Sequence, residues 1–63
     1  MLTYNMDARG RMAKYDYLYQ SIKEDILEGA IRPGERLPSK RALAEHLGLS
    51  VVTVDAAYQQ LVE

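Results

Sequence analysis

Four basic side chains lie within ten residues in the middle of this 63-residue chain, and they are its clearest candidates for chemistry. Guanidinium and ammonium groups gathered in this way bind phosphate, Arg through paired hydrogen bonds and Lys as a point charge. The whole chain nevertheless has a net charge of -1, because acidic residues dominate elsewhere. The cluster predicts either a phosphate-binding surface or a loop with ordinary solvated charge. Its members are Arg32, Arg36, Lys40 and Arg41, with Glu35 opposing them.

Catalytic and metal-binding chemistry has little support in the sequence. His46 is the single histidine and there is no cysteine, so a zinc site lacks ligands. His46 and Ser50 lie four residues apart, but no third residue orients the pair as a hydrolase requires. Five tyrosines could stack on bases, yet Tyr19 and Tyr58 fall on predicted core faces, which favours packing. We therefore expect no enzyme activity, no metal and no cofactor in these 63 residues.

The length and composition limit the fold to one small domain. A chain of this size buries only about 60% of the surface that its unfolded form exposes, so its stability should be marginal. The absence of cysteine removes disulfides and fits a reducing compartment. No apolar run approaches the roughly 20 residues of a membrane span. We expect a cytoplasmic protein with no membrane partner.

The first part of the chain divides into an arm and a helix. Residues 1–15 show no helical or strand periodicity, so we expect a flexible N-terminal arm. Apolar residues then recur every three or four positions and predict an amphipathic helix over residues 16–28. Asp16 is the expected N-cap, and Gly29 the expected C-terminal cap. The predicted apolar face carries Leu18, Tyr19, Ile22, Ile26 and Leu27.

A tight turn and a second helix follow. Pro33 and Gly34 are typical of the two central positions of a turn, because Pro fixes φ and Gly tolerates positive φ. Ser39 is the expected N-cap of a short helix over residues 39–47. Gly48 supplies the backbone freedom for a sharp change of direction after it.

A third helix is predicted over residues 50–62, with Ser50 as N-cap and Leu49 packing onto Val54. The second and third helices form a helix-turn-helix, which presents the outer face of its second helix to the major groove. A three-helix bundle with an inactive outer face is the alternative. The candidate base-reading residues, opposite Val54, are Val52, Thr53, Ala56, Gln59 and Gln60.

The order and spacing of many residues resemble the winged helix-turn-helix of GntR-family bacterial repressors over residues 18–62. The matching run is Leu18-Tyr19-x-x-Ile22, then Pro33-Gly34-x-x-Leu37-Pro38-Ser39-x-Arg41-x-Leu43-Ala44-x-x-Leu47-Gly48-x-Ser50-x-x-Thr53-Val54. The resemblance implies a mainly all-α fold, a three-helix head of a winged-helix domain without its β-wing, occupying residues 16–63. It also implies sequence-specific DNA binding as the N-terminal head of a bacterial transcription regulator.

The resemblance implies DNA contacts from the starts of the second and third helices. Arg41 and Lys40 would meet phosphate or guanine, and the N-terminus of the third helix suits a phosphate. The implied DNA-binding residues are Ser39, Lys40, Arg41, Ser50, Val51, Val52, Thr53 and Ala56.

Two residues depart from the family's pattern. Val51 stands where arginine often follows the serine, and Asp55 stands at a position that is often basic. Valine can touch a thymine methyl group but cannot donate a hydrogen bond, and Asp55 would repel phosphate. We therefore expect a lower affinity for DNA than the family pattern would give.

The end of the chain suggests a longer parent. Residues 56–61 are similar to the MocR branch, in which this head precedes a large domain resembling a pyridoxal-phosphate aminotransferase. Glu63 stops before any wing residue, so we expect a truncated regulator. Its full-length parent would form homodimers on operator half-sites and confine pyridoxal phosphate to its C-terminal domain.

Alone, the fragment is expected to self-associate through apolar surface left on Tyr58, Leu61 and Val62. The alternative function is a binding-dead helical fragment that acts only through protein contacts.

Overall fold

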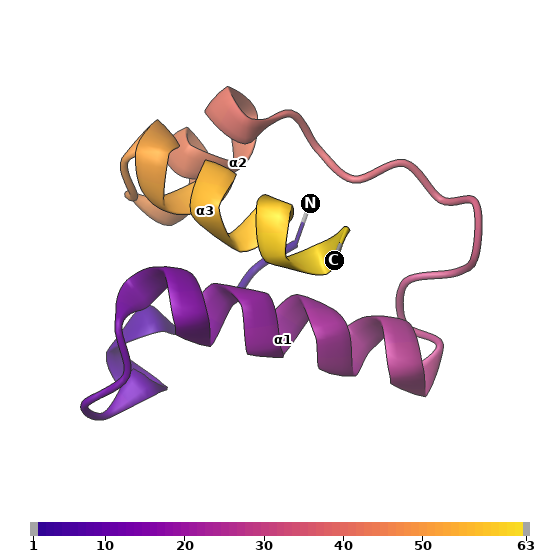
Figure 1. Ribbon diagram of the computed structural model, residues 1–63, viewed down its shortest axis with the longest axis horizontal. Helices are drawn as coiled ribbons and strands as arrows, with labels where there is room; N and C mark the ends of the chain where they lie inside the picture. The colour runs from indigo at the N-terminus through magenta and orange to yellow at the C-terminus, as the bar shows by residue number, and fades with distance from the viewer. Residues whose placement is uncertain (1, 63) are drawn as a thin grey trace.

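The computed structural model describes residues 2–62, which form three α-helices preceded by a short 3-10 turn (Figure 1). Helix α3 packs against both α1 and α2, so it is the central element of the domain. No strand occurs among the described residues, and the predicted all-α helix-turn-helix head is confirmed. The elements are η1 (Met6–Arg9), α1 (Lys14–Glu28), α2 (Lys40–Leu47) and α3 (Val51–Leu61).

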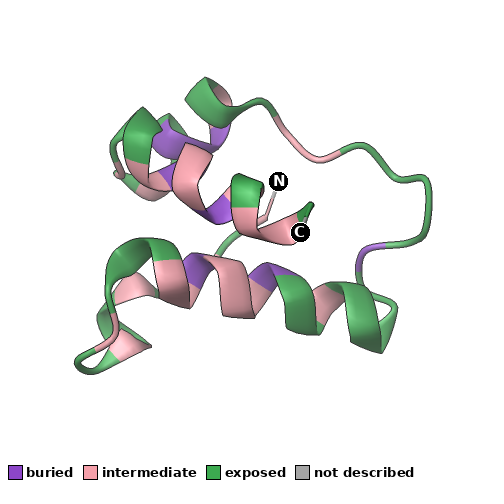
Figure 2. Ribbon diagram, viewed as in Figure 1, coloured by how far each residue is buried: buried purple, intermediate pink, exposed green. Residues whose placement is uncertain are grey.

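A small apolar core holds the helices together. Val54 and Ala57 lie one turn apart on α3, so one stripe of that helix is buried. Figure 2 shows the buried positions on the sides of the helices that face one another. Each α-helix therefore buries one narrow apolar face, and its other side chains are partly or fully exposed to solvent. The buried residues are Leu18, Ile22, Ile31, Leu43, Ala44, Val54 and Ala57.

Both predicted serine caps are present. The Ser39 Oγ accepts a hydrogen bond from the Ala42 N–H at 3.1 Å, and the Ser50 Oγ accepts one from the Thr53 N–H at 3.1 Å. Each serine satisfies an N–H group that has no partner within its own helix. The two caps fix α2 to begin at Lys40 and α3 to begin at Val51, one residue inside the predicted ranges.

The turn between α2 and α3 depends on Gly48, whose φ of +71° is left-handed. Its N–H donates to the Glu45 carbonyl at 3.4 Å, and the Leu49 N–H donates to the Ala44 carbonyl at 2.8 Å. This pair of bonds closes the end of α2 and sends the chain directly into α3. The Pro33-Gly34 turn is also confirmed, because the Glu35 N–H donates to the Arg32 carbonyl at 3.0 Å and Gly34 has a φ of +84°.

Helix α1 ends at Glu28 with Gly29 as its left-handed cap, as predicted, but it differs from its prediction at the N-terminus and in the burial of its last turn. It begins at Lys14 with Ala13 as N-cap, so the assignment of Asp16 as the cap is wrong. Asp16 instead lies in the first turn, where a negative charge favours the helix dipole. Ile26 and Leu27, predicted to be apolar-face residues, are 43% and 76% exposed. The last turns of α1 extend beyond α3, so no helix covers them (Figure 1).

The N-terminal segment is packed, which differs from the flexible arm expected over residues 1–15. Leu2, Tyr4 and Met6 are partly buried against the core and alternate with exposed residues, as in an extended chain with one inward side. The Tyr4 hydroxyl donates a hydrogen bond to the Asp25 carboxylate at 2.6 Å. Burial and this bond raise the pKa of Tyr4 well above its usual value. The alternation of inward and outward side chains covers only Leu2 to Met6, which is too short to predict packing from the sequence.

The end of α3 is better covered than expected. The Tyr58 hydroxyl donates to the Pro38 carbonyl at 2.7 Å, and both Tyr58 and Leu61 pack against the core. The predicted packing role of Tyr58 is therefore confirmed. Val62 is 86% exposed, so the apolar surface predicted for three residues is reduced mainly to this one.

Truncating Leu43 to alanine should unfold a large share of the protein at 25 °C. The Leu43 side chain is fully buried, and such a truncation costs about 2–5 kcal/mol, which is comparable to the whole stability of a domain this small. Thermal melting followed by circular dichroism measures the loss. Leu27→Ala is the matched control, because Leu27 is 76% exposed and its loss should leave the melting temperature nearly unchanged. Equal melting of the two variants would contradict the packing described above.

Candidate nucleic-acid interface

The outer face of α3 projects away from the core. Because Val54 and Ala57 point inward, Val52 and Gln59 point outward, and Val52 is 78% exposed. Thr53 and Ala56 are half-buried at the margins of this face. The structure therefore places the predicted reading residues on one surface of one helix.

The N-terminus of α3 is capped by hydroxyl groups of its own residues. The Ser50 Oγ and Thr53 Oγ1 lie 2.8 Å apart and share a hydrogen bond, in addition to the cap described above. The N–H groups of Val51 and Val52 precede the first hydrogen bond within the helix, which runs from the Val54 N–H to the Ser50 carbonyl at 3.2 Å. Such N–H groups carry the positive end of the helix dipole and suit an anion.

An ion pair ties the start of α2 to the outer face of α3. The Lys40 Nζ lies 2.5 Å from the Asp55 Oδ1, and the Gln59 Nε2 donates to the Asp55 Oδ2 at 2.9 Å. The hydrogen bond from Lys40 is the main cause that lowers the pKa of Asp55. Asp55 was expected to repel phosphate, but its charge is compensated within the domain. Sequence reasoning missed this pair because the partners are fifteen positions apart on different helices.

Arg41 offers a cation that the domain does not use. Its side chain is exposed and makes no hydrogen bond or ion pair with any residue from 2 to 62. It follows Lys40, whose charge is committed to Asp55, so Arg41 is the available cation at the start of α2. The Ser39 hydroxyl next to them is engaged as the cap of α2.

The predicted DNA-binding residues form two groups. Lys40 meets Asp55 beside the middle of α3, whereas Ser50 meets Thr53 at its start. Within residues 2–62, no hydrogen bond or ion pair joins these two groups. Along α3, Val52 lies between Ser50 and Thr53, and Ala56 directly follows Asp55.

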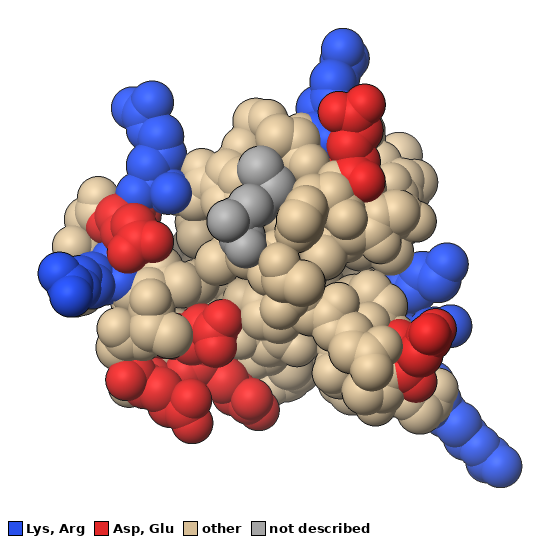
Figure 3. Space-filling model, turned by 180° about the vertical axis from the view of Figure 1, so that it is seen from behind, with Lys and Arg blue, Asp and Glu red and all other residues tan. Residues whose placement is uncertain are grey.

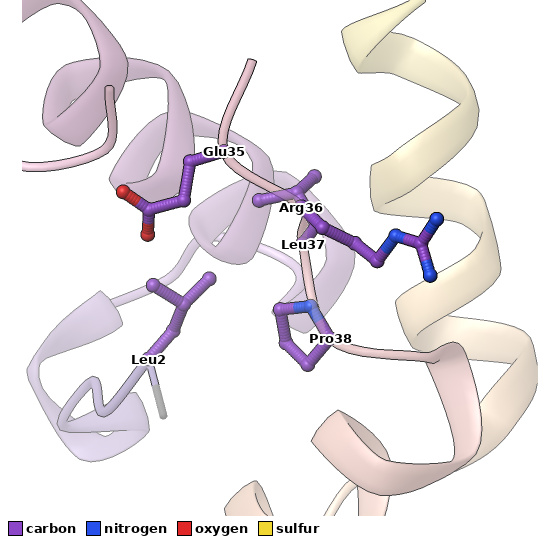
Figure 4. Close-up of a pocket in the computed structure, with 5 residues that line it drawn as sticks. All are labelled: Leu2, Glu35, Arg36, Leu37 and Pro38. Atoms are coloured by element: carbon purple, nitrogen blue, oxygen red, sulfur yellow. The ribbon is translucent and has the colours of Figure 1, made fainter. Parts of the chain in front are cut away.

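The basic cluster seen in the sequence is spread over the surface. Figure 3 shows basic side chains projecting at separate points around one face of the molecule, several with an acidic side chain nearby, while the largest acidic group lies at one corner. Arg36 belongs to a shallow hollow of about 540 Å³, from which its side chain extends on the side of α3 (Figure 4). Arg32 and Arg36 lie in the loop between α1 and α2, whereas Arg41 is exposed in the first turn of α2, and the choice between the two sequence alternatives stays a prediction. The hollow is lined by Leu2, Glu35, Arg36, Leu37 and Pro38.

His46 is not paired with Ser50. Its Nε2 lies 2.9 Å from the Thr3 Oγ1, and Ser50 is engaged with Thr53. Among residues 2–62, no three acidic, cysteine or histidine side chains gather in a way that could hold a metal ion. In that same part of the chain, none of the helices combines the length and the apolar character needed to cross a bilayer.

The sequence matches the family described as bacterial regulatory proteins, gntR family, over residues 14–63. The chain belongs to the GntR family. It is 56% identical over 45 residues to the HTH-type transcriptional regulator TauR of Rhodobacter capsulatus, covering 71% of this chain and 9% of TauR. This GntR chain is also 38% identical over 56 residues to the HTH-type transcriptional repressor YtrA of Bacillus subtilis, covering 89% of this chain and 43% of YtrA.

A third relative has a named role. The Mannosyl-D-glycerate transport/metabolism system repressor MngR of Escherichia coli is 41% identical over 54 residues, covering 86% of this chain and 22% of MngR. The GntR chain therefore spans less than half the length of each of these three relatives. What the relatives share with it is the helix-turn-helix part of a transcription regulator.

Asp55→Asn should lower the melting temperature at neutral pH, and acidification should remove the difference from the wild type. Because Lys40 lowers the pKa of Asp55 below the ordinary value of 3.8, the carboxylate stabilises the fold above that pH. This contribution is lost as the pH falls through the folded-state pKa. Melting curves at pH 7, 5 and 3 measure it. Glu28→Gln is the control, since the Glu28 carboxylate has no partner among the described residues and its loss should not destabilise the fold at pH 7.

Proposed function

We propose that this GntR domain binds duplex DNA sequence-specifically as the head of a bacterial transcription regulator, with α3 in the major groove. The observation that carries this function is the presentation of α3. Its buried stripe is held by α1 and α2, and its opposite face, with Val52 78% exposed, stands clear of the core. A helix-turn-helix domain uses such a face to contact base edges.

The charges support the same orientation. Arg41 has no partner within residues 2–62, and the Val51 and Val52 N–H groups lie at the positive end of α3. Phosphates on either side of the groove would meet these two groups, while Lys40 stays with Asp55. Phosphate contacts of this kind fix the register of a protein on DNA without reading its sequence.

The whole regulator is proposed to be longer and dimeric. The three relatives above are all longer than this chain. The MocR branch is proposed only from the resemblance of residues 56–61. Two heads on two half-sites would make the second contact intramolecular and raise the affinity. Such a regulator would act in the cytoplasm and need no catalytic step in this domain. Pyridoxal phosphate does not fit these residues, because the hollow in Figure 4 has no lysine for a Schiff base.

Arg41→Ala should weaken the binding of duplexes of every sequence. If Arg41 holds a phosphate, its loss should cost about 1 kcal/mol or more and reduce the slope of log K against log salt by about 0.9. Fluorescence anisotropy with a labelled 20-base-pair duplex pool, titrated at several salt concentrations from 50 mM upward, measures both quantities. If Arg41 instead reads guanine, the loss will be confined to duplexes with one particular base.

Arg11→Ala is the control of equal charge. Arg11 lies between η1 and α1, away from α2 and α3, and makes no hydrogen bond or ion pair with the described residues (Figure 1). Its loss should change the affinity less than that of Arg41. If the folded wild-type chain shows no salt-dependent binding at 50 mM salt, the proposed function of this domain is wrong. The alternative, a helical fragment that acts only through protein contacts, would then be favoured.

A further inference from the structure

We propose that α3 reads thymine through its C5-methyl group and that Val52 is the residue that determines this specificity. The inference rests on the proposed DNA binding and names the base feature that the helix recognises. It follows from which side chains on the outer face of α3 already make hydrogen bonds or ion pairs within the domain and which exposed side chains make none.

The polar side chains nearest the leading end of α3 are satisfied within the domain. Ser50 and Thr53 share a hydrogen bond of 2.8 Å while Ser50 also caps the helix. Asp55 accepts from both Lys40 and Gln59, which lie on either side of it. The atoms that make these bonds can read a base only after a contact of the folded domain breaks, although the hydroxyl pair and the Gln59 amide keep further hydrogen-bonding capacity.

The helix also lacks the side chains that read guanine. Residues 51–61 contain no Arg and no Lys, and a bidentate contact to the guanine O6 and N7 requires one of them. Arg41 makes no hydrogen bond or ion pair among residues 2–62, but it lies on α2 rather than on the face that enters the groove. Guanine is therefore not the base that α3 itself is built to select.

Methyl groups remain at the leading end of the outer face. Val52 is 78% exposed, Val51 is 44% exposed, and Ala56 lies one turn after Val52 on the same side. In the major groove, thymine is the one standard base that presents a methyl group, and apolar side chains contact it. Val52, as the most exposed of the three, would bury its two γ-methyl groups against that methyl.

The occupant of this apolar surface is duplex DNA rather than another protein. The helix dipole and the free Arg41 border it with positive charge, which complements phosphate. The ion pair of Asp55 with Lys40 lowers the repulsion that a free carboxylate would exert beside the groove.

The test removes methyl groups from both partners, one from thymine and the two γ-methyl groups from Val52. The 63-residue chain first selects duplexes from a pool with a randomised centre. Each thymine of the selected site is then replaced in turn by deoxyuridine, which keeps every hydrogen-bonding group and lacks only the methyl. We expect the wild type to lose about fourfold in affinity at one or two positions, the change that burial of one methyl-sized group produces. Val52→Ala should bind the thymine and deoxyuridine duplexes equally at those positions.

Val62→Ala is the matched control, because Val62 is 86% exposed and lies at the other end of α3. It should keep the wild-type discrimination, and melting curves should show that both variants fold. If the wild type binds its selected duplex but no deoxyuridine changes the affinity, or if Val52→Ala keeps the discrimination, this inference is wrong and the proposed function stands.

Two further outcomes would also overturn the inference. If the wild type selects no duplex at all, the proposed function fails and the inference fails with it. If Val52→Ala alters self-association in sedimentation velocity and leaves DNA binding unchanged, the apolar surface belongs to a second copy of the chain, and the inference is overturned.

Discussion

Burial of the Val54 and Ala57 stripe of α3 is the constraint on which the rest of the domain depends. Both side chains are fully buried, and α3 is the helix that contacts both of the others. Burying a valine contributes roughly 1.5–3 kcal/mol, a large share of the stability of so short a chain. Because the stripe is fixed, the rotation of α3 about its axis is fixed too. The identity of the residues that face outward is thus a consequence of packing.

The start of α3 shows how one local hydrogen-bonding motif stabilises the helix and also sets the chemistry of its exposed face. Ser50 is the N-cap of α3, and its Oγ accepts a hydrogen bond from the Thr53 N–H. The same Oγ also shares a hydrogen bond with the Thr53 hydroxyl group. These hydroxyl groups are then committed to the cap. The exposed side chains that remain at this end are aliphatic, so the chemistry of the outer face is set by what the cap has used.

The sequence predicted the features that short-range chemistry determines. Ser39, Ser50 and Gly48 act within four residues of themselves, and their caps and turn are present as predicted. The alternation of buried and exposed positions on α2 and α3 was predicted for the same reason.

The features that were missed all join distant parts of the chain. Lys40 and Asp55 meet because α2 folds back along α3, and no local pattern marks them as partners. Tyr4 reaches Asp25 across twenty-one positions, and Ile26 is exposed because α3 is too short to cover it. The outward face of α3 could be predicted from periodicity, but which of its polar groups are free could not, because that depends on such long-range contacts.

The net charge of -1 is a poor guide to DNA binding here, because the main acidic group and the unpaired Arg41 lie on different helices. Acidic residues gather on the second half of α1, at Glu24, Asp25 and Glu28, whereas the unpaired Arg41 lies on α2, with α3 packed against both helices. The domain measures 28 × 23 × 22 Å, and salt at 0.1 M screens charge over about 10 Å. A phosphate beside α2 would therefore respond to Arg41 and the N-terminus of α3 far more than to the carboxylates of α1. On the proposed function, the same separation would turn the domain as it approaches a duplex, since α1 would be repelled and Arg41 and the N-terminus of α3 attracted. The orientation that electrostatics would favour is then the one that the proposal requires, with Val52 toward the groove.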